Sequence, residues 1–148
     1  MQENEKYEYD FTVGWTRALL DGINDNSNNT YASFEKCACF HYSANNMEDI
    51  IKKYVGNPDG FLNFLSEAWG WKINKSDDTG KIIIDEGKNF CVCPVVHRME
   101  NNVPPVICNC SEHFAQKMFS AVVGNQVNVK VIRSFVRDGK SCIYEITL

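Results

Sequence analysis

The sequence contains no apolar run that approaches the roughly 18 residues a membrane-spanning helix needs. A signal-peptide pattern is also missing, because residues 1–5 are acidic where such a leader would be basic and then apolar. We therefore expect no membrane association and a cytoplasmic location.

Clusters of lysine and arginine are absent as well, and the 148 residues carry a net charge of −4 with an isoelectric point near 5.3. A negative surface repels a phosphate backbone, so the sequence predicts no nucleic-acid partner. Internal repeats and shifts of composition that would mark a linker are missing too. With 44% hydrophobic and 12% aromatic residues, the sequence predicts one globular domain spanning residues 1–148.

Helical patterns occupy the first half of the chain. Apolar residues recur every four positions across residues 7–23 and predict a first helix there. A second helix is expected from residue 30, with Thr30 as its cap, and a third from about residue 46. A fourth is expected over residues 58–69, because a proline opens it and Gly70 can end it.

Strand patterns follow and predict an antiparallel β-meander, at residues 71–74, 81–86 and 89–96. A further helix is expected over residues 111–123, with Ser111 as N-cap. Two strands joined by a turn at residues 138–139 close the chain. The expected fold class is therefore α+β, with N-terminal helices, an antiparallel β-meander, one further helix and a C-terminal β-hairpin joining the same sheet.

Seven cysteines are many for a chain of this size, and a reducing compartment argues against a framework of structural disulfides. Six of them share one Cys-x-Cys spacing and one stands alone: Cys37/Cys39, Cys91/Cys93, Cys108/Cys110 and Cys142. Scattered core thiols would rarely fall in that pattern, so the cysteines are the candidate chemistry.

On a strand over residues 89–96, Cys91 and Cys93 would point to the same side and form a chelating pair. Cys108 and Cys110 would precede a helix N-terminus, whose partial positive charge favours thiolate. If that helix packs on the sheet that holds Cys142, a tetrahedral zinc site of four thiolates becomes plausible. The predicted metal ligands are drawn from Cys91, Cys93, Cys108, Cys110 and Cys142, and an iron–sulfur cluster is a variant of the same site.

Other uses of these thiols stay open. Free cysteine is among the most buried residue types, so the thiols could be inert core residues. A thiolate at Cys108 or Cys110 could also attack an electrophile, with His113 as a candidate base. Cys37 and Cys39 would point to nearly opposite faces of the second helix, so only one could face a shared site. A histidine follows each cysteine pair and is a candidate ligand: His41, His97 and His113.

From Cys108 onward the chain resembles the vinyl-4-reductase-like domain of bacteriochlorophyll biosynthesis proteins and of regulators that sense aromatic compounds. Three segments carry the resemblance: Cys-Asn-Cys-Ser at 108–111, Ala-Val-Val-Gly at 121–124 and residues 133–142. The same tail is similar to the family of the 2-amino-thiazoline-carboxylate hydrolases. Because these motifs are short, the resemblance supports fold more than activity.

The resemblance implies, in the aromatic-sensing members, a zinc held by three cysteines and a glutamate. Cys108 and Cys142 fall on two of those cysteine positions, whereas Ser134 replaces the third cysteine and Val131 the glutamate. The family's zinc site therefore cannot be copied, and the missing thiolates would have to come from Cys110, Cys91 and Cys93.

The resemblance also implies a pocket for a small hydrophobic molecule between helices and sheet. Three functions remain open. The first is a cysteine-rich, metal-binding domain that binds a small-molecule ligand or senses metal or redox state. The second is a thiol-dependent hydrolase, and the third is an interaction module with buried thiols. A homodimer is compatible with each of them.

Overall fold

The structure, a computed structural model, describes residues 2–99 and 101–148. Its N-terminal part is helical: α1 (Glu3–Asp25), α2 (Thr30–Ser33), α3 (Glu35–Ala44), α4 (Met47–Ile51) and α5 (Pro58–Trp69). The remainder is mixed: β1 (Lys72–Lys75), β2 (Lys81–Asp85), α6 (Pro94–Arg98), the 3₁₀ turn η1 (Pro105–Ile107), α7 (Cys108–Val123), β3 (Asn128–Arg133), α8 (Phe135–Asp138) and β4 (Ile143–Thr147).

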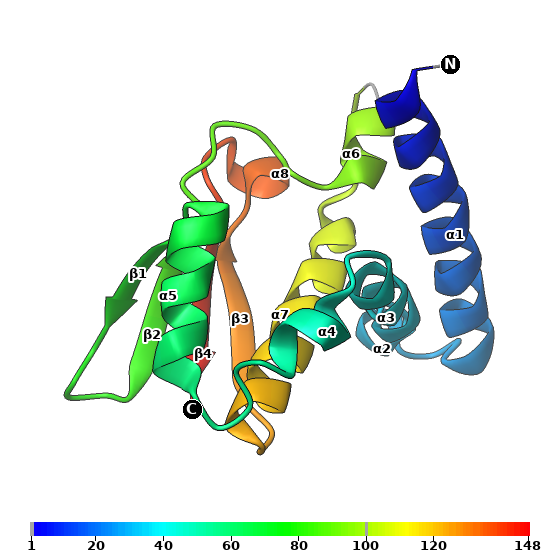
Figure 1. Cartoon of the computed structure of the whole chain (residues 1–148). Coiled ribbons are helices and arrows are strands. Elements are labelled where there is room, and N and C mark those ends of the chain that lie inside the picture. The colour runs from blue at the N-terminus through cyan, green and yellow to red at the C-terminus, as the bar shows by residue number, and fades with distance from the viewer. Residues whose placement is uncertain (1, 100) are drawn as a thin grey trace.

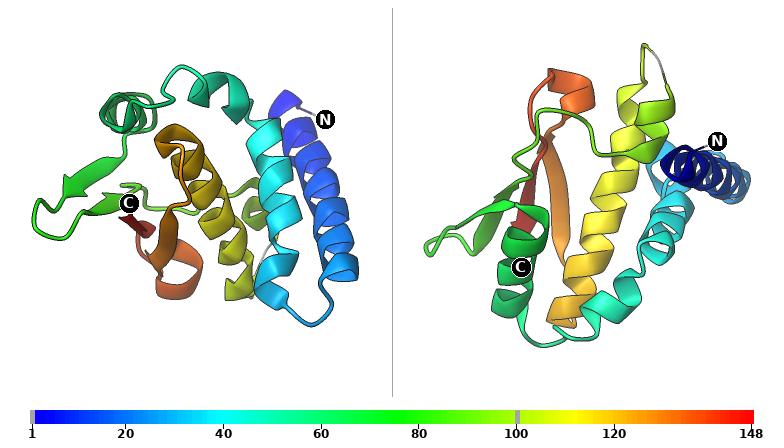
Figure 2. Two further views of the ribbon diagram at one scale, coloured as in Figure 1. Left: turned by 90° about the horizontal axis from the view of Figure 1, so that it is seen from below. Right: turned by 45° about the horizontal axis from the view of Figure 1, so that its top comes forward.

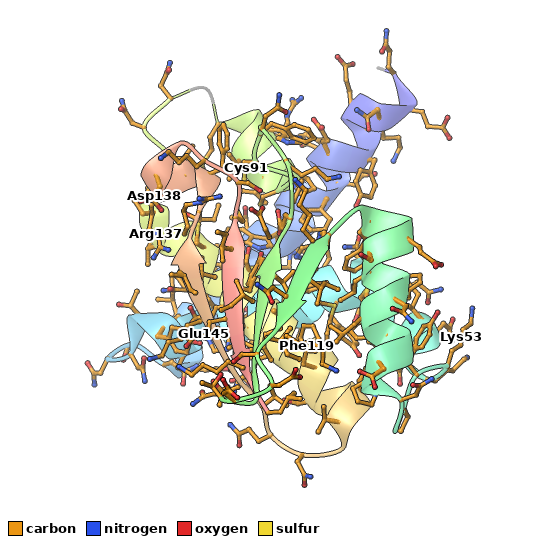
Figure 3. All side chains as sticks on the ribbon, turned by 90° about the vertical axis from the view of Figure 1, so that its left-hand side faces the viewer. Lys53, Cys91, Phe119, Arg137, Asp138 and Glu145 are labelled. Carbon is orange, nitrogen blue, oxygen red and sulfur yellow. The ribbon has the colours of Figure 1, made fainter. Side chains whose placement is uncertain are left out.

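The strands form an antiparallel sheet in the order β1-β2-β4-β3. Helices α5 and α7 pack against one face of this sheet, α3 packs on the far side of α7, and α1 lies outermost (Figure 1). Figure 3 looks onto the other face, over which no helix of the described chain lies. The predicted α+β class is thereby confirmed, with its N-terminal helices and a C-terminal hairpin that joins the sheet.

The core fills the space between the sheet and α7. The register pairs Ile82 with Ile146 and Ile84 with Tyr144, so these four side chains share one face. All four are buried, and Phe119 of α7 is buried opposite them. Alternation of period two in the strands thus meets the apolar stripe of a helix, as expected for a half-buried sheet. Among the described residues, none of the helices combines the length and hydrophobicity needed to cross a bilayer.

The helical predictions differ from the structure mainly at helix N-termini. Helix α1 begins four residues early because the Glu5 carboxylate accepts a hydrogen bond from the Gln2 backbone N–H, at 3.2 Å. The second predicted helix is divided at Phe34 into α2 and α3. Its cap is Asn29 and not Thr30, since the Asn29 side chain accepts from the Ala32 N–H.

The predicted strand over residues 89–96 is wrong. Gly87 adopts a φ of +67°, which turns the chain away from the sheet directly after β2. Both neighbours of β2 are already β1 and β4, so a strand following it has no free edge there. Pro94, which lacks an N–H, opens α6 instead. Cys91 and Cys93 therefore lie on a loop, not on a strand.

The predicted start of the helix at Ser111 is also wrong. The turn η1 leads directly into α7, which begins at Cys108, so Ser111 lies inside the helix and is not its N-cap. The predicted hairpin turn at residues 138–139 is the end of the short helix α8. Ser134 caps α8, because its Oγ accepts from the Arg137 N–H at 3.1 Å.

Candidate functional site

A cavity of about 640 Å³ opens where the N-terminal ends of α1 and α7 meet α6 and the start of β4. Figure 2 shows α6 beside the N-terminal part of α7 and close to α1. The lining includes every cysteine predicted as a metal ligand: Cys91, Cys93, Cys108, Cys110 and Cys142. They come from three segments that are far apart in the sequence, and the fold brings them to one place.

The loop between β2 and α6 carries Cys91 and Cys93 across the cavity. At its start, the Lys88 N–H donates to Ser141 Oγ at 3.0 Å, which ties the loop to the segment before β4. At its end, His97 Nδ1 lies 3.3 Å from Glu8 Oε1 of α1, and His97 Nε2 contacts the Cys91 carbonyl. The two thiols are therefore held between the sheet and the outermost helix.

Glu86 also lines the cavity, and the predicted ligand set does not contain it. Its carboxyl Oε1 accepts a hydrogen bond from Tyr144 Oη at 2.9 Å, and the residue is 4% exposed. Among the described residues no lysine, arginine or histidine lies within ion-pair distance of it. Burial is the largest cause that raises the pKa of this carboxyl. The signal was present in the sequence, because Ile82, Ile84 and Glu86 alternate on one face.

Three of the thiols gather around Glu86. The negative charge of Glu86 raises the pKa of Cys91, Cys108 and Cys142, although burial is the larger cause for each thiol. Cys142 also interacts electrostatically with Cys91 and Cys108, so the four groups share one region of the cavity. In Figure 3, Cys91 lies at the end of the sheet where Arg137 and Asp138 of α8 are labelled.

Cys110 belongs to a second group, on the helical side of the cavity. Trp15 Nε1 donates to Cys110 Sγ at 3.3 Å, and Cys37 and His41 lie close enough to Cys110 to shift the pKa of its thiol. Cys37 is fully buried, whereas Cys39 lines a separate hollow between α3 and α7. The two thiols thus lie on different faces of α3, and neither of them lines the cavity.

The expectation that a helix N-terminus activates Cys108 and Cys110 is wrong in sign. Burial raises the pKa of Cys108, while the interaction with Cys37 and then burial hold the pKa of Cys110 well above its ordinary value. Burial likewise raises the pKa of Cys91 and Cys93 to about 11 and that of Cys142 to about 12. At neutral pH these are neutral thiols, because burial, together with the interaction with Cys37 in the case of Cys110, disfavours the thiolate.

The chemistry of these donors fits a soft metal ion, whereas their spacing is wider than a bound metal requires. Among the described residues, no group of three or more His, Cys, Asp or Glu is close enough to hold an ion. Sulfur donors and a buried carboxyl without a balancing cation nevertheless suit zinc, which deprotonates the thiols it binds. The predicted tetrahedral arrangement would need the thiols to move together.

The three candidate histidines have different surroundings. His41 lines the cavity and stacks on Phe114, with ring centroids 4.3 Å apart. His97 lines it from α6. His113 does not, because its Nε2 contacts the Tyr31 carbonyl at 2.8 Å in the hollow that holds Cys39. His113 therefore cannot serve as a base for Cys108 or Cys110 in this conformation.

Aromatic rings complete the cavity wall. Trp71 stacks on Tyr144 with an interplanar angle of 17°, and Trp69 meets Trp71 edge to face at 5.1 Å. These rings leave an apolar surface next to the polar groups, as small-molecule sites commonly do. Ser134, at the position where the resemblance placed a cysteine, is buried and close enough to Cys108 to lower the pKa of that thiol.

The fold and the site together define an α+β domain with a cysteine-lined, partly aromatic cavity between its sheet and its outer helices. Comparisons with protein-family models, with curated proteins and with solved structures give no match.

Proposed function

We propose that this protein is a cytoplasmic, cysteine-rich domain that binds a small molecule in its cavity and a soft metal ion through the cavity thiols. The observation that supports the proposal is the convergence of five cysteines from three chain segments on one cavity. Seven free thiols also suit a reducing compartment. Zinc is the ion that best suits a sulfur-rich set of four donors.

The donors we propose for the metal are Cys91, Cys108, Cys142 and Glu86. Glu86 raises the pKa of all three thiols, although burial is the larger cause for each, and among the described residues no cation lies within ion-pair distance of this carboxyl, so a divalent cation would relieve the repulsion. Three cysteines and a glutamate are also what the vinyl-4-reductase resemblance implies. Here Glu86 and Cys91 would replace the two family positions occupied by Val131 and Ser134.

The rest of the cavity is the proposed small-molecule site. Its volume of about 640 Å³ is in the usual range for such sites, roughly 300–1,000 Å³. Trp69, Trp71 and Phe114 offer apolar contacts, while Lys88 and His41 offer polar ones. If a ligand contacts both the thiol side and the aromatic side of the cavity, its affinity will depend on whether the metal is bound. This dependence is the basis for a sensor role.

A zinc titration of metal-free protein, prepared without oxygen, tests the proposal. Calorimetry in two buffers that differ in ionisation enthalpy should give about one zinc per chain and the release of protons from the thiols. Cys142→Ser should weaken binding by at least about tenfold, because it removes one of four donors. Cys39→Ser is the matched control and should bind zinc as the wild type does. Failure of the wild type to bind zinc would refute the metal site.

A thiol-dependent hydrolase is the second candidate, favoured by the proximity of His41 to Cys110, which lowers the pKa of this thiol against the larger effects of Cys37 and burial. Such a pair can activate a nucleophile when the histidine accepts the thiol proton. Cys110 is 5% exposed and the pKa of its thiol is raised, so this candidate ranks below the first. It requires that iodoacetamide label Cys110 much faster than the other six cysteines in the folded protein.

A further inference from the structure

Glu86 has one carboxyl oxygen that the described chain leaves without a partner. Its Oε1 accepts the hydrogen bond of 2.9 Å from Tyr144 Oη, whereas Oε2 accepts none from the described residues. Every fully enclosed side-chain oxygen or nitrogen of those residues has a hydrogen-bond partner, so Oε2 must be reached by solvent. Glu86 as a whole is only 4% exposed, and it lines the cavity. The open oxygen therefore faces the cavity.

The cations that line the cavity are held at other places. Lys88 Nζ lies 3.5 Å from the position that a Cβ would take at Gly70, the residue that ends α5. The carbonyl groups at a helix C-terminus favour a cation there. His97 lies 3.3 Å from Glu8 Oε1, at the opposite wall. Within the described ranges no basic side chain reaches ion-pair distance of Glu86.

Apolar side chains form the wall beside this carboxyl. Trp71 stacks on the ring of Tyr144, with centroids 5.8 Å apart, so the indole and the carboxyl of Glu86 both contact one phenol. Further apolar side chains of the lining are Ala68, Trp69, Ile107, Phe114 and Val136. A buried carboxyl next to aromatic rings attracts an ammonium group, and the apolar wall favours an apolar body attached to that group.

We propose that the metal-free cavity binds a primary ammonium compound with an apolar body, which competes with the metal for Glu86. The ammonium group donates to Oε2, and the apolar body lies against Trp69 and Trp71. A primary ammonium group suits this oxygen because it has three N–H donors, whereas a quaternary one has none. The inference rests on the proposed function, since it names the ligand of the same cavity and uses a carboxyl assigned to the metal.

Competition follows from the shared carboxyl. The proposed metal takes Glu86 together with three thiols, and a second cation placed at the same carboxyl would be repelled by the first. Two ligands that exclude each other weaken each other's binding by the same factor. A rise in the concentration of the ammonium compound therefore releases metal, which gives the sensor role a direction.

Calorimetry with hexylamine tests the ligand. Metal-free protein, prepared without oxygen in a buffer that contains no amine, should bind hexylamine at least about tenfold more tightly than hexanol at pH 7, because only the amine is charged. Glu86→Gln should abolish this preference, and its circular dichroism spectrum shows whether it is folded. Glu145→Gln is the matched control, since Glu145 follows Tyr144 on β4 and points to the other face of the sheet. It should bind hexylamine as the wild type does.

Two results of this experiment would overturn the proposal. One is equal binding of hexylamine and hexanol by the wild type, which needs no variant and shows that no carboxylate receives the ammonium group. The other is an unchanged preference for hexylamine in folded Glu86→Gln, which would place the ammonium group elsewhere.

A competition experiment separates this inference from the metal site. Saturating hexylamine should weaken the binding of zinc to the wild type, by the same factor by which zinc weakens the binding of hexylamine. Zinc binding that hexylamine leaves unchanged would overturn the competition. If hexylamine fails to bind while zinc binds, this inference is wrong and the metal site stands. If zinc fails to bind, the metal site and the competition are both wrong, and the preference for hexylamine over hexanol still decides the ligand.

Discussion

Tyr144 Oη donates a hydrogen bond of 2.9 Å to Glu86 Oε1, and both side chains are buried at the thiol-lined cavity. The phenol gives the carboxyl one strong partner, whereas no cation of the described chain neutralises its charge at close range. Burial therefore raises the pKa of Glu86, and this hydrogen bond offsets only part of the effect. The pair is a local weakness of the metal-free protein.

Replacement of Glu86 by glutamine should stabilise the metal-free protein at neutral pH. The folded-state pKa of Glu86 lies above its ordinary value of 4.5, so the folded state binds this proton more tightly than the unfolded state does. The contribution to stability is present at low pH and is lost as the pH rises through the folded-state pKa. At pH 7, Glu86→Gln should raise the midpoint of thermal unfolding by about 2–4 °C for each kcal/mol by which it stabilises the folded state. The difference between the variant and the wild type should shrink toward pH 4.5. A lower midpoint for the variant at pH 7 would contradict this account.

Removal of the Tyr144 hydroxyl should have the opposite effect. Tyr144→Phe keeps the ring that stacks on Trp71 but leaves the Glu86 carboxyl without its phenol donor. We expect a loss of about 1–3 kcal/mol, measured by urea unfolding at pH 7. In the Glu86→Gln background the same change should be milder, since a neutral amide is less costly to leave unpaired. Equal losses in both backgrounds would show that the carboxyl charge is irrelevant.

The cavity thiols should alkylate slowly and with a steep pH dependence. Because the pKa is about 11 for Cys91 and about 12 for Cys142, their thiolate fractions rise roughly tenfold per pH unit from pH 7 upward. Iodoacetamide labelling of metal-free folded protein, read by peptide mass spectrometry, should show this slope without a plateau below pH 9. The urea-unfolded chain is the control and should level off near the ordinary thiol pKa.

Two glycines of α1 should respond differently to alanine. A Cβ at Gly22 would lie 2.1 Å from the backbone oxygen of Ser33, which cannot move without shifting α2. A Cβ at Gly14 would meet the tip of the Phe40 ring, which can rotate. We expect Gly22→Ala to lose about 1–3 kcal/mol. Gly14→Ala should lose less, because a gain of roughly 1 kcal/mol in helix propensity offsets part of the clash. Urea denaturation of the two variants side by side decides the order.

The outer edge of strand β3 should promote intermolecular strand pairing when the two side chains that cover it, those of Glu112 and Arg137, are removed. Val131 points both backbone groups outward, where its N–H donates to Glu112 Oε2 and its carbonyl accepts from Arg137 Nη2, each at 2.8 Å. Glu112→Ala/Arg137→Ala frees both groups and should promote strand-to-strand association. Light scattering should detect assemblies larger than those of the wild type. Lys130→Ala, on the same strand, is the control and should not aggregate.

Helix ends were predictable where a local signal is strong. The bounds of α5 agree with the prediction, because Asn57 caps it, Pro58 opens it and Gly70 ends it with a φ of +70°. Gly124 ends α7 in the same way, with a φ of +82°. In each case the residues that decide the conformation are neighbours in the sequence.

The prediction of a strand over residues 89–96 was wrong because the conformation of this segment depends on residues far away in the sequence. Alternating apolar side chains indicate a strand only if a sheet edge is free to pair with it, and β4, some fifty residues later, occupies that edge of β2. The β-propensity of the segment could not reveal this competition. The same limit explains why Cys91 and Cys93 were placed in one sheet-bound pair.

The grouping of cysteines was predictable in part. The Cys-x-Cys spacing drew attention to the five thiols that line the cavity, and helical geometry separated Cys37 from Cys39. The approach of Cys37 and His41 to Cys110 depends on how α3 packs on α7, which no local pattern encodes. Nor does spacing show that burial raises the pKa of these thiols.

The loop between β2 and α6 is fastened by contacts that span most of the chain. Lys88 and Ser141 are 53 residues apart in sequence, and His97 and Glu8 are 89 apart. Contacts of such long range form late in folding, because the entropy of closing long loops opposes them. We therefore expect Cys91 and Cys93 to be more accessible to solvent before β4 joins the sheet than in the folded protein. A metal or an oxidant should react with these thiols most easily while the chain is still incompletely folded. The conditions of expression should therefore affect the metal content and the oxidation state of the purified protein.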